Sequence, residues 1–144
     1  MARLKGGCKQ IRIATTENFT APAVTIGRGN LLKEGQEWPK PDIKNDELAD
    51  ERKLQAGVVY GFAHNLSGVP EADYTTISGF AADGVEVFVE YTSLDGATKT
   101  VVKNVILMCS RSPVVEFGKV AFMRIEGTAS GTKESDVITV TTTP

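Results

Sequence analysis

Two runs of alternating residues, joined by an Asp-Gly turn, constrain this fold more than any other part of the sequence. Val85, Val87, Val89 and Tyr91 alternate with charged and aromatic residues, and the turn Leu94-Asp-Gly96 leads into a second run over 99–109. An Asp-Gly turn between alternating runs is a strong signal for a β-hairpin. The second run loses its alternation over 105–109. We therefore expect both faces of that strand to be buried there, by its own core and by another sheet or subunit.

The rest of the chain favours strands and turns over helices, so we expect a mainly β protein. One helix is predicted over Pro70–Ser78, because proline suits a first turn and acidic residues follow it, with Gly79 as its stop. The tract 127–133 is small and polar, and we expect a loop there. Further strands are expected over 10–15, 23–26, 57–66, 120–127 and 136–143. This pattern favours a single domain over 1–144, built as a β-sandwich or barrel-type domain with one short helix and a long extended loop.

A charged segment interrupts this strand-rich pattern. From Lys33 to Leu54, twelve of 22 residues are charged. Compact domains rarely keep a loop of this length unless it is functional or disordered. We therefore predict a projecting arm at about 33–56 that meets a neighbouring subunit. Its candidate contact residues are Glu37, Trp38, Pro39, Pro41, Ile43 and Leu48.

Trp38 is the only tryptophan of the chain, and the sequence places it in the charged segment between Glu37 and Pro39. Two interpretations stay open. In the first, Trp38 anchors the arm in a pocket of a partner. In the second, it folds back onto its own domain as a lid.

Charge is distributed unevenly along the chain. Residues 1–32 sum to +4, 33–54 to −2, 55–95 to −6 and 96–144 to +2, which gives the formal total of −2. The simplest interpretation is a set of solvated surfaces whose signs mix in the fold, and the functional one is complementary faces in a polymer. No segment is basic enough to predict tight binding of nucleic acid.

The sequence offers no catalytic constellation, and we expect no enzyme and no cofactor. His64 is the single histidine, and a satisfied structural side chain is the favoured interpretation. Ser67 and Ser78 lie in no nucleophile motif, and Gly27–Asn30 lacks the ending of a phosphate-binding loop. A metal site is not expected either, because the acidic residues of the arm miss the spacing of a calcium-binding loop.

Cys8 and Cys109 are too few for a zinc site with only one histidine to help. A disulfide between them stays open, and a buried free thiol is favoured for Cys109. The chain shows neither a secretory signal nor an apolar run of membrane-spanning length, so we expect no membrane partner and synthesis in the cytoplasm.

The order of the parts resembles the tail tube proteins of long-tailed bacteriophages and of contractile injection machines. The resemblance is carried by the hairpin, by Phe117–Phe122, and by the tract Gly127–Gly131 before a final strand. It covers about half of the chain and contains no diagnostic motif. Fold analogy alone does not establish function.

This resemblance implies a virion structural protein that forms hexameric rings, which stack into a tube around DNA as non-specific cargo. It also implies contacts with other phage tail proteins, and assembly in the host cytoplasm. Ring closure hides sheet edges that are open in the single subunit. The lumen candidates are Glu86 and Glu90, with Lys99 and Lys103 opposite them as charge partners.

Two other classes compete with this hypothesis. The first is a binding module, such as a capsid decoration protein or a carbohydrate-binding β-sandwich, with an aromatic surface formed by Trp38, Tyr60 and Tyr74. The second is a small hydrolase built around His64. Rings or tubes would support the structural subunit, a monomer would support the binding module, and activity lost on replacing His64 would support the hydrolase.

Overall fold

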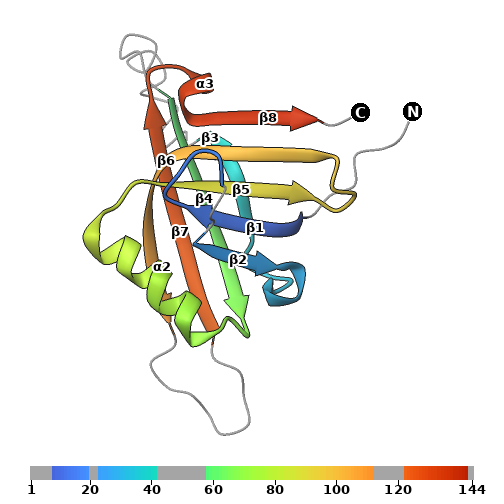
Figure 1. The fold of residues 1–144 in the computed structure, drawn as a ribbon, viewed down its shortest axis with the longest axis vertical. Helices are drawn as coiled ribbons and strands as arrows, with labels where there is room; N and C mark the ends of the chain where they lie inside the picture. Colours follow the sequence, from blue (N-terminus) through green and yellow to red (C-terminus); the bar gives the residue numbers. More distant parts are fainter. Residues whose placement is uncertain (1–7, 20–22, 42–57, 112–121, 143–144) are drawn as a thin grey trace, which may run out of the picture.

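The computed structural model describes residues 8–19, 23–41, 58–111 and 122–142, and they form a mainly β domain (Figure 1). Eight strands make one antiparallel sheet in the order β2-β1-β5-β6-β7-β4-β3, with β8 paired to β6. The strands are β1 (Cys8–Ala14), β2 (Val24–Gly27), β3 (Glu37–Pro41), β4 (Val58–Ser67), β5 (Val87–Ser93), β6 (Thr98–Arg111), β7 (Phe122–Gly131) and β8 (Ile138–Thr142). The helices are η1 (Arg28–Asn30), α2 (Glu71–Asp83) and α3 (Glu134–Val137). The predicted fold class is confirmed.

Strand β6 belongs to two layers. Its residues 98–102 pair with β5 on one side and with β8 on the other, whereas residues 105–111 pair with β7. Between the two parts lies Asn104, whose backbone has a φ of 57°. We call β2, β1, β5, the first part of β6 and β8 the first layer, and the second part of β6 with β7, β4 and β3 the second layer. Figure 1 shows the strands of the two layers crossing at a large angle, as in an orthogonal packing.

The core lies between the two layers, where alternate residues of each strand point inward. The first layer contributes Ile11 and Ile13, and the second contributes Leu66, Leu107 and Ile125, all at most 2% exposed. The strand order ends at β2 and β3, which do not pair with each other in the described residues. The sandwich is therefore not a closed barrel.

The β5–β6 hairpin is confirmed at its predicted place. Gly96 turns the chain with a φ of 77°. The Asp95 carboxylate accepts hydrogen bonds from the Ser93 hydroxyl at 2.6 Å and from the Ala97 N–H at 2.9 Å. The expectation of burial on both faces over 105–109 is not met within the subunit, because Ile106 and Met108 are 40% and 68% exposed.

Helix α2 is longer than predicted, and Gly79 does not end it. The helix runs over thirteen residues to Asp83, and Gly84 follows with a left-handed φ of 63°. Glycine is destabilising inside a helix but does not stop it, whereas a left-handed residue after the last turn does. No helix of the described residues is long and apolar enough to cross a membrane.

The predicted loop over 127–133 is wrong for its first five residues. Residues 127–131 are the end of β7, and they pair with β4 on one side and with β6 on the other. Small residues are needed here because the strand is packed closely. A side chain at Gly127 would collide with the ring of Phe62. Composition alone therefore suggested a loop where close packing requires glycine.

Part of the segment predicted as an arm is a strand of the sheet. Residues 37–41 form β3, which pairs with β4 through the partners Glu37–Ala63, Lys40–Gly61 and Pro41–Tyr60. Trp38 therefore lies in a strand, contrary to the prediction. The rest of the arm, with Ile43 and Leu48, lies outside the described residues.

Candidate functional site

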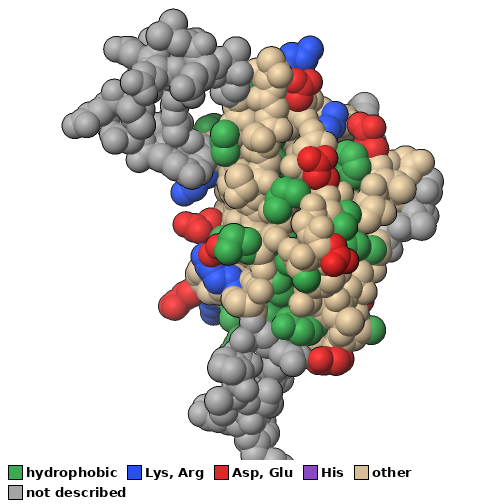
Figure 2. Space-filling view, turned by 90° about the vertical axis from the view of Figure 1, so that its left-hand side faces the viewer, with side chains coloured by type: hydrophobic (Ala, Val, Ile, Leu, Met, Phe, Trp, Pro, Cys, Tyr) green, Lys and Arg blue, Asp and Glu red, His purple; other side chains and the backbone are tan. Residues whose placement is uncertain are grey.

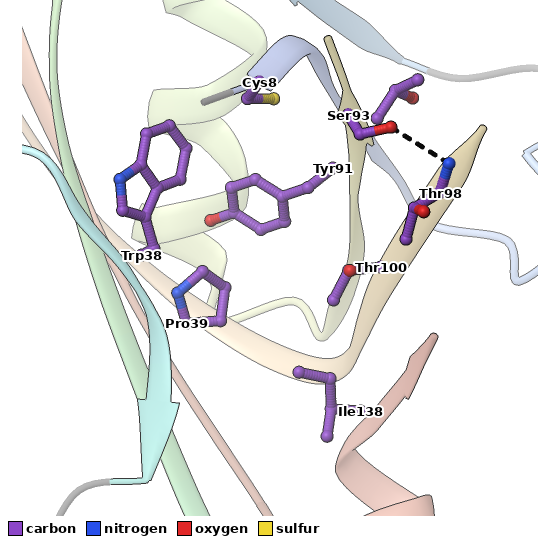
Figure 3. Close-up of a pocket in the computed structure, with 9 residues that line it drawn as sticks. Cys8, Trp38, Pro39, Tyr91, Ser93, Thr98, Thr100 and Ile138 are labelled. Carbon is purple, nitrogen blue, oxygen red and sulfur yellow. Dashed lines mark hydrogen bonds between the residues drawn. The ribbon is translucent and has the colours of Figure 1, made fainter. Parts of the chain in front are cut away.

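One hollow of the described surface lies between β3 of the second layer and β8 of the first. It is a pocket of about 250 Å³, and we call it the open seam. Figure 3 shows Trp38 and Pro39 on one side, Thr98 and Thr100 on the other, and Tyr91 between them. The lining residues are all uncharged: Cys8, Trp38, Pro39, Tyr91, Thr92, Ser93, Thr98, Thr100 and Ile138.

One row of side chains shows that the core is uncovered at the seam. Four residues stand opposite one another across β1, β5, β6 and β8, namely Ile11, Tyr91, Thr100 and Val140. Opposite residues of antiparallel strands point to the same face. Exposure along this row rises from 0% at Ile11 and 7% at Tyr91 to 62% at Val140. The inward face of β8 therefore lacks the cover that the second layer gives to β1 and β5.

Trp38 packs against its own domain at the seam. Its ring centroid lies 5.0 Å from that of His64 and 5.9 Å from that of Tyr91, and the contact with Tyr91 is edge-to-face. Such pairs add to the stability gained by burial alone. The side chain is still 39% exposed. The geometry matches the lid interpretation of Trp38, with one side of its ring left to solvent.

Beneath Trp38, His64 is held in one tautomer. The Gln36 amide nitrogen donates to the carbonyl oxygens of Leu32 and Asn65, at 2.9 and 2.7 Å. The Gln36 amide oxygen therefore faces His64 Nδ1, 2.7 Å away, and accepts its proton. His64 Nε2 then accepts from the Tyr91 hydroxyl at 2.7 Å. Both ring nitrogens have partners, which confirms the predicted satisfied side chain.

The buried groups of the seam are neutral at pH 7. Burial, assisted by the positive charge of Arg124, lowers the pKa of His64 to about 4. Burial raises the pKa of Tyr91 well above its ordinary value, and burial also raises the pKa of the Cys8 thiol. The seam thus combines aromatic and aliphatic surface with hydroxyl groups, and it suits an uncharged surface of a ligand or partner.

The four lumen candidates differ in exposure and in partners. Glu90 is only 5% exposed, because its carboxylate accepts a hydrogen bond from Arg12 Nε at 2.8 Å. The ring of Phe19 lies 5.2 Å from the Arg12 guanidinium. Glu86 is exposed and precedes β5.

The two lysines are not the partners of these acids. Lys99 stands opposite Thr92, and Glu90 stands opposite Val101. Lys103 lies 3.5 Å from Glu17 instead. Counting back from the turn already gives these pairs, and the bulge in β5 lies beyond them, between residues 87 and 89.

The described arm residues belong to the edge strand β3. The Glu37 carboxylate lies 3.5 Å from Arg124, Pro39 lines the open seam, and Pro41 stands opposite Tyr60. Proline has no N–H, so its place in a sheet is an edge strand. β3 carries two of them and a bulge in its pairing with β4.

A second surface lies on the outer face of the second layer, and the candidate residues taken from the sequence did not include it. Met108 is 68% exposed, Phe122 49%, Ile106 40% and Val59 38%. Figure 2 shows hydrophobic side chains exposed on the side of the molecule where β6 and α2 lie. The unbroken apolar run over 105–109 was the signal in the sequence. Beyond Val105, this part of β6 pairs only with β7 in the described residues.

Among the described residues, no group of three or more His, Cys, Asp or Glu side chains could hold a metal ion. Cys8 and Cys109 are not joined by a disulfide.

Comparison with known proteins adds no assignment. No family model, curated protein or solved structure matches this chain.

Proposed function

We propose that this protein is a structural subunit that binds copies of itself head to tail, as in the tube of a phage tail, and that its rings form a conduit for DNA. One observation carries the proposal: residues 106–111 of β6 form a sheet edge with exposed apolar side chains. Ile106 and Met108 are exposed on the outer face of the sheet beside this edge, and on the side away from β7 no strand of the described residues pairs with residues 106–111. Natural proteins usually protect such an edge with charge, proline or a covering segment.

The direction of the strands favours head-to-tail pairing through the second layer. Its four strands run in the order β6-β7-β4-β3 with antiparallel neighbours, so β3 and β6 point in opposite directions. Copies related by rotation would then place β3 of one subunit antiparallel to β6 of the next. In the first layer the edge strands β2 and β8 run in the same direction. Copies related by the same rotation would therefore place β2 of one subunit parallel to β8 of the next. Antiparallel pairing is slightly more stable per residue.

The charges of the second layer suit a conduit that does not grip DNA. Arg124 lies on its outer face, where its guanidinium donates to Glu126 at 2.9 Å and lies 3.5 Å from Glu37. The positive charge is therefore offset by neighbouring carboxylates. Binding to the phosphate backbone requires basic groups that are free to replace counterions. Thr128 and Ser130, which follow on the same face, are neutral and exposed.

The test is the state of assembly of the purified chain. We expect light scattering and negative-stain electron microscopy to show rings or tubes. Met108→Lys should abolish them while circular dichroism stays unchanged, because a charged side chain on an edge strand disfavours its pairing with another strand. Thr141→Lys, on an exposed position of β8, is the matched control and should assemble normally. A wild-type chain that stays monomeric at all concentrations would refute the proposal, as would normal assembly of Met108→Lys.

The aromatic residues that motivated a binding module do not form one surface. Tyr60 is only 7% exposed, and its hydroxyl donates to Glu134 at 2.6 Å. Tyr74 lies on α2 and Trp38 on β3. These three side chains therefore do not make the aromatic contact surface that a binding module would need.

A further inference from the structure

The free edge of β8 lacks the features that usually protect an edge strand. Residues 138–142 pair with β6 on one side, and on the other side no strand of the described residues pairs with them. Their sequence, Ile-Thr-Val-Thr-Thr, consists of strand-forming residues and contains no charge and no proline. Natural proteins usually protect such an edge with charged side chains, proline or a bulge, because its unpaired N–H and C=O groups can pair with another strand.

The edge strands β2 and β3 differ from β8 in this respect. β3 carries two prolines and a bulge. β2 has only four residues and runs directly into η1. β8 pairs with β6 in a regular register over all five of its residues, and Figure 1 shows it as the outermost strand of the first layer. β8 is therefore better suited than β2 or β3 to accept a further strand.

We propose that β8 pairs antiparallel with β8 of a second copy, around a two-fold axis at Val140. This inference goes beyond the proposed ring, which uses β3 and β6 of the second layer. In the pair, Val140 stands opposite its own counterpart. Thr139 stands opposite Thr141, and Ile138 stands opposite Thr142, so all five residues of both strands are paired. A two-fold contact joins two copies and then closes.

The two faces of the strand match in this register. The row of inner residues that runs from Ile11 to Val140 meets the same row of the second copy, and β-branched side chains pack well on a pleated surface. On the outer face, Thr139 meets Thr141, and threonine pairs across two strands stabilise a sheet. The first layers of the two copies would thus form one continuous sheet.

The charges around β8 favour a second copy of the same strand as its partner. A strand that pairs with itself brings like charges together wherever it carries one, and β8 carries none. The stretch of β6 beside it, residues 98–102, has a single charge on Lys99. In the pair, the two Lys99 residues are separated by at least three strand spacings, about 14 Å. Salt screens the repulsion between exposed charges at that distance.

Val140 is the apolar side chain that the pair would cover. It is 62% exposed on the inner face, whereas Tyr91 of the same row is 7% exposed. Opposite residues of antiparallel strands have Cα atoms about 5 Å apart, so the two Val140 side chains would lie against each other. Removing apolar surface from water is favourable. The two open seams would then lie on the same face of the joined sheet, on either side of this contact.

A chain that cannot form the proposed ring tests the pair by its oligomeric state. For Met108→Lys, we expect sedimentation equilibrium to show a dimer in equilibrium with the monomer. Adding Val140→Lys should weaken this dimer about ten-fold or more with circular dichroism unchanged, because a charged side chain on an edge strand disfavours pairing. Val140→Lys alone should still form rings.

These results separate the pair from the ring. A Met108→Lys chain that stays monomeric at all concentrations would overturn the β8 pair, and rings of the wild-type chain would still support the proposed function. A wild-type chain that forms only dimers, which Val140→Lys dissociates, would overturn the ring and support the β8 pair.

Disulfide crosslinking tests the register in a chain that keeps its charges. Val140→Cys should crosslink between two copies on mild oxidation, because opposite Cα atoms lie within the range of a disulfide. Mass spectrometry identifies the linked peptides, and the wild-type chain with its free Cys8 and Cys109 gives the background. The matched control is Thr142→Cys on the same face. It should not crosslink to itself, because the two positions lie about 14 Å apart, four residues along the strand.

A mixture of two variants sharpens this test. Thr142→Cys and Ile138→Cys should crosslink to each other, because these positions stand opposite in the proposed register, and neither should crosslink to itself. Dimers in which Val140→Cys gives no link between copies would overturn the pairing. Self-crosslinking of Thr142→Cys at the level of Val140→Cys would overturn it as well.

Discussion

The β5–β6 hairpin and strand β3 are both antiparallel pairings of one sheet, yet different forces hold them. The hairpin has a tight Asp-Gly turn, and the side chains on its inner face, Val87, Val89 and Val102, are all 0% exposed. β3 has five residues, two prolines and a bulge. Besides its pairing with β4, two side-chain contacts hold it in place. Gln36, just before the strand, forms a hydrogen bond with His64, and the Trp38 ring packs edge-to-face on Tyr91.

The difference shows that the position of a strand can be determined by the sequence around it, as in the hairpin, or by contacts with residues far along the chain, as in β3. The hairpin is specified within a continuous stretch of 25 residues, from Val87 to Arg111. The partners of β3 come from β4, β5 and β7, which lie further along the chain. We expect the hairpin to be part of the global unfolding unit and β3 to open at lower free energy. Four substitutions break or sharpen this contrast.

The largest effect is expected in the hairpin itself. Leu107 is 2% exposed, and Leu107→Ala should lower the free energy of unfolding by about 2–5 kcal/mol through lost burial and the cavity left behind. Met108, the next residue, is 68% exposed. Met108→Ala in the monomer should therefore change the free energy of unfolding by about 0.5 kcal/mol at most. Denaturation in urea measures both. Equal effects of the two substitutions would contradict the assigned faces of β6.

An intermediate effect on the free energy of unfolding is expected from the protonation of His64, which contacts β3 and the residue before it. The pKa of His64 is about 4 in the folded protein against 6.5 for a free side chain. Between these pH values the unfolded chain binds a proton that the folded chain does not. The free energy of unfolding should therefore fall by about 3 kcal/mol as the pH drops from 6.5 to 4, with no contribution from this group above that range.

Replacing the histidine isolates this contribution. His64→Phe should remove that part of the pH dependence, because the remaining titratable groups are common to both proteins. Urea denaturation at pH 7, 5.5 and 4 gives the comparison. The same slope in both proteins would show that His64 is protonated with its ordinary pKa in the fold.

The smallest effect is expected on the outer side of β3. Glu37 is about half exposed and lies 3.5 Å from Arg124. Exposed ion pairs of this kind contribute little, so Glu37→Gln should cost about 0.5 kcal/mol or less, and added salt should reduce the difference further. A loss of several kcal/mol would mean that β3 is held mainly from its outer face, contrary to the role assigned to Gln36 and Trp38.

The same contrast explains how far the sequence alone could predict the structure. The mainly β class and the hairpin followed from alternation and one turn, both local signals. β3 was missed because Glu37–Pro41 has neither alternation nor strand-forming residues, and its place depends on His64 and Tyr91. The length of α2 was missed because the stop at Gly84, rather than Gly79, is a matter of backbone conformation.

The candidate site was predicted only in part. Trp38 was singled out correctly as unusual, but its neighbours across the seam come from four other strands and carry no common motif. Glu90 was expected to face a channel, since alternation placed it opposite the valines. Its partner Arg12 lies 78 positions away, and no local pattern could reveal that pairing.

The sharing of β6 between the two layers has a mechanical consequence. Because one continuous backbone crosses from the first layer to the second, neither layer can rotate freely against the other. Any such rotation must twist the chain near Asn104, which already has a left-handed φ of 57°. A relative rotation of the layers must therefore deform this shared strand, so a load on one layer is transmitted to the other through the backbone of β6.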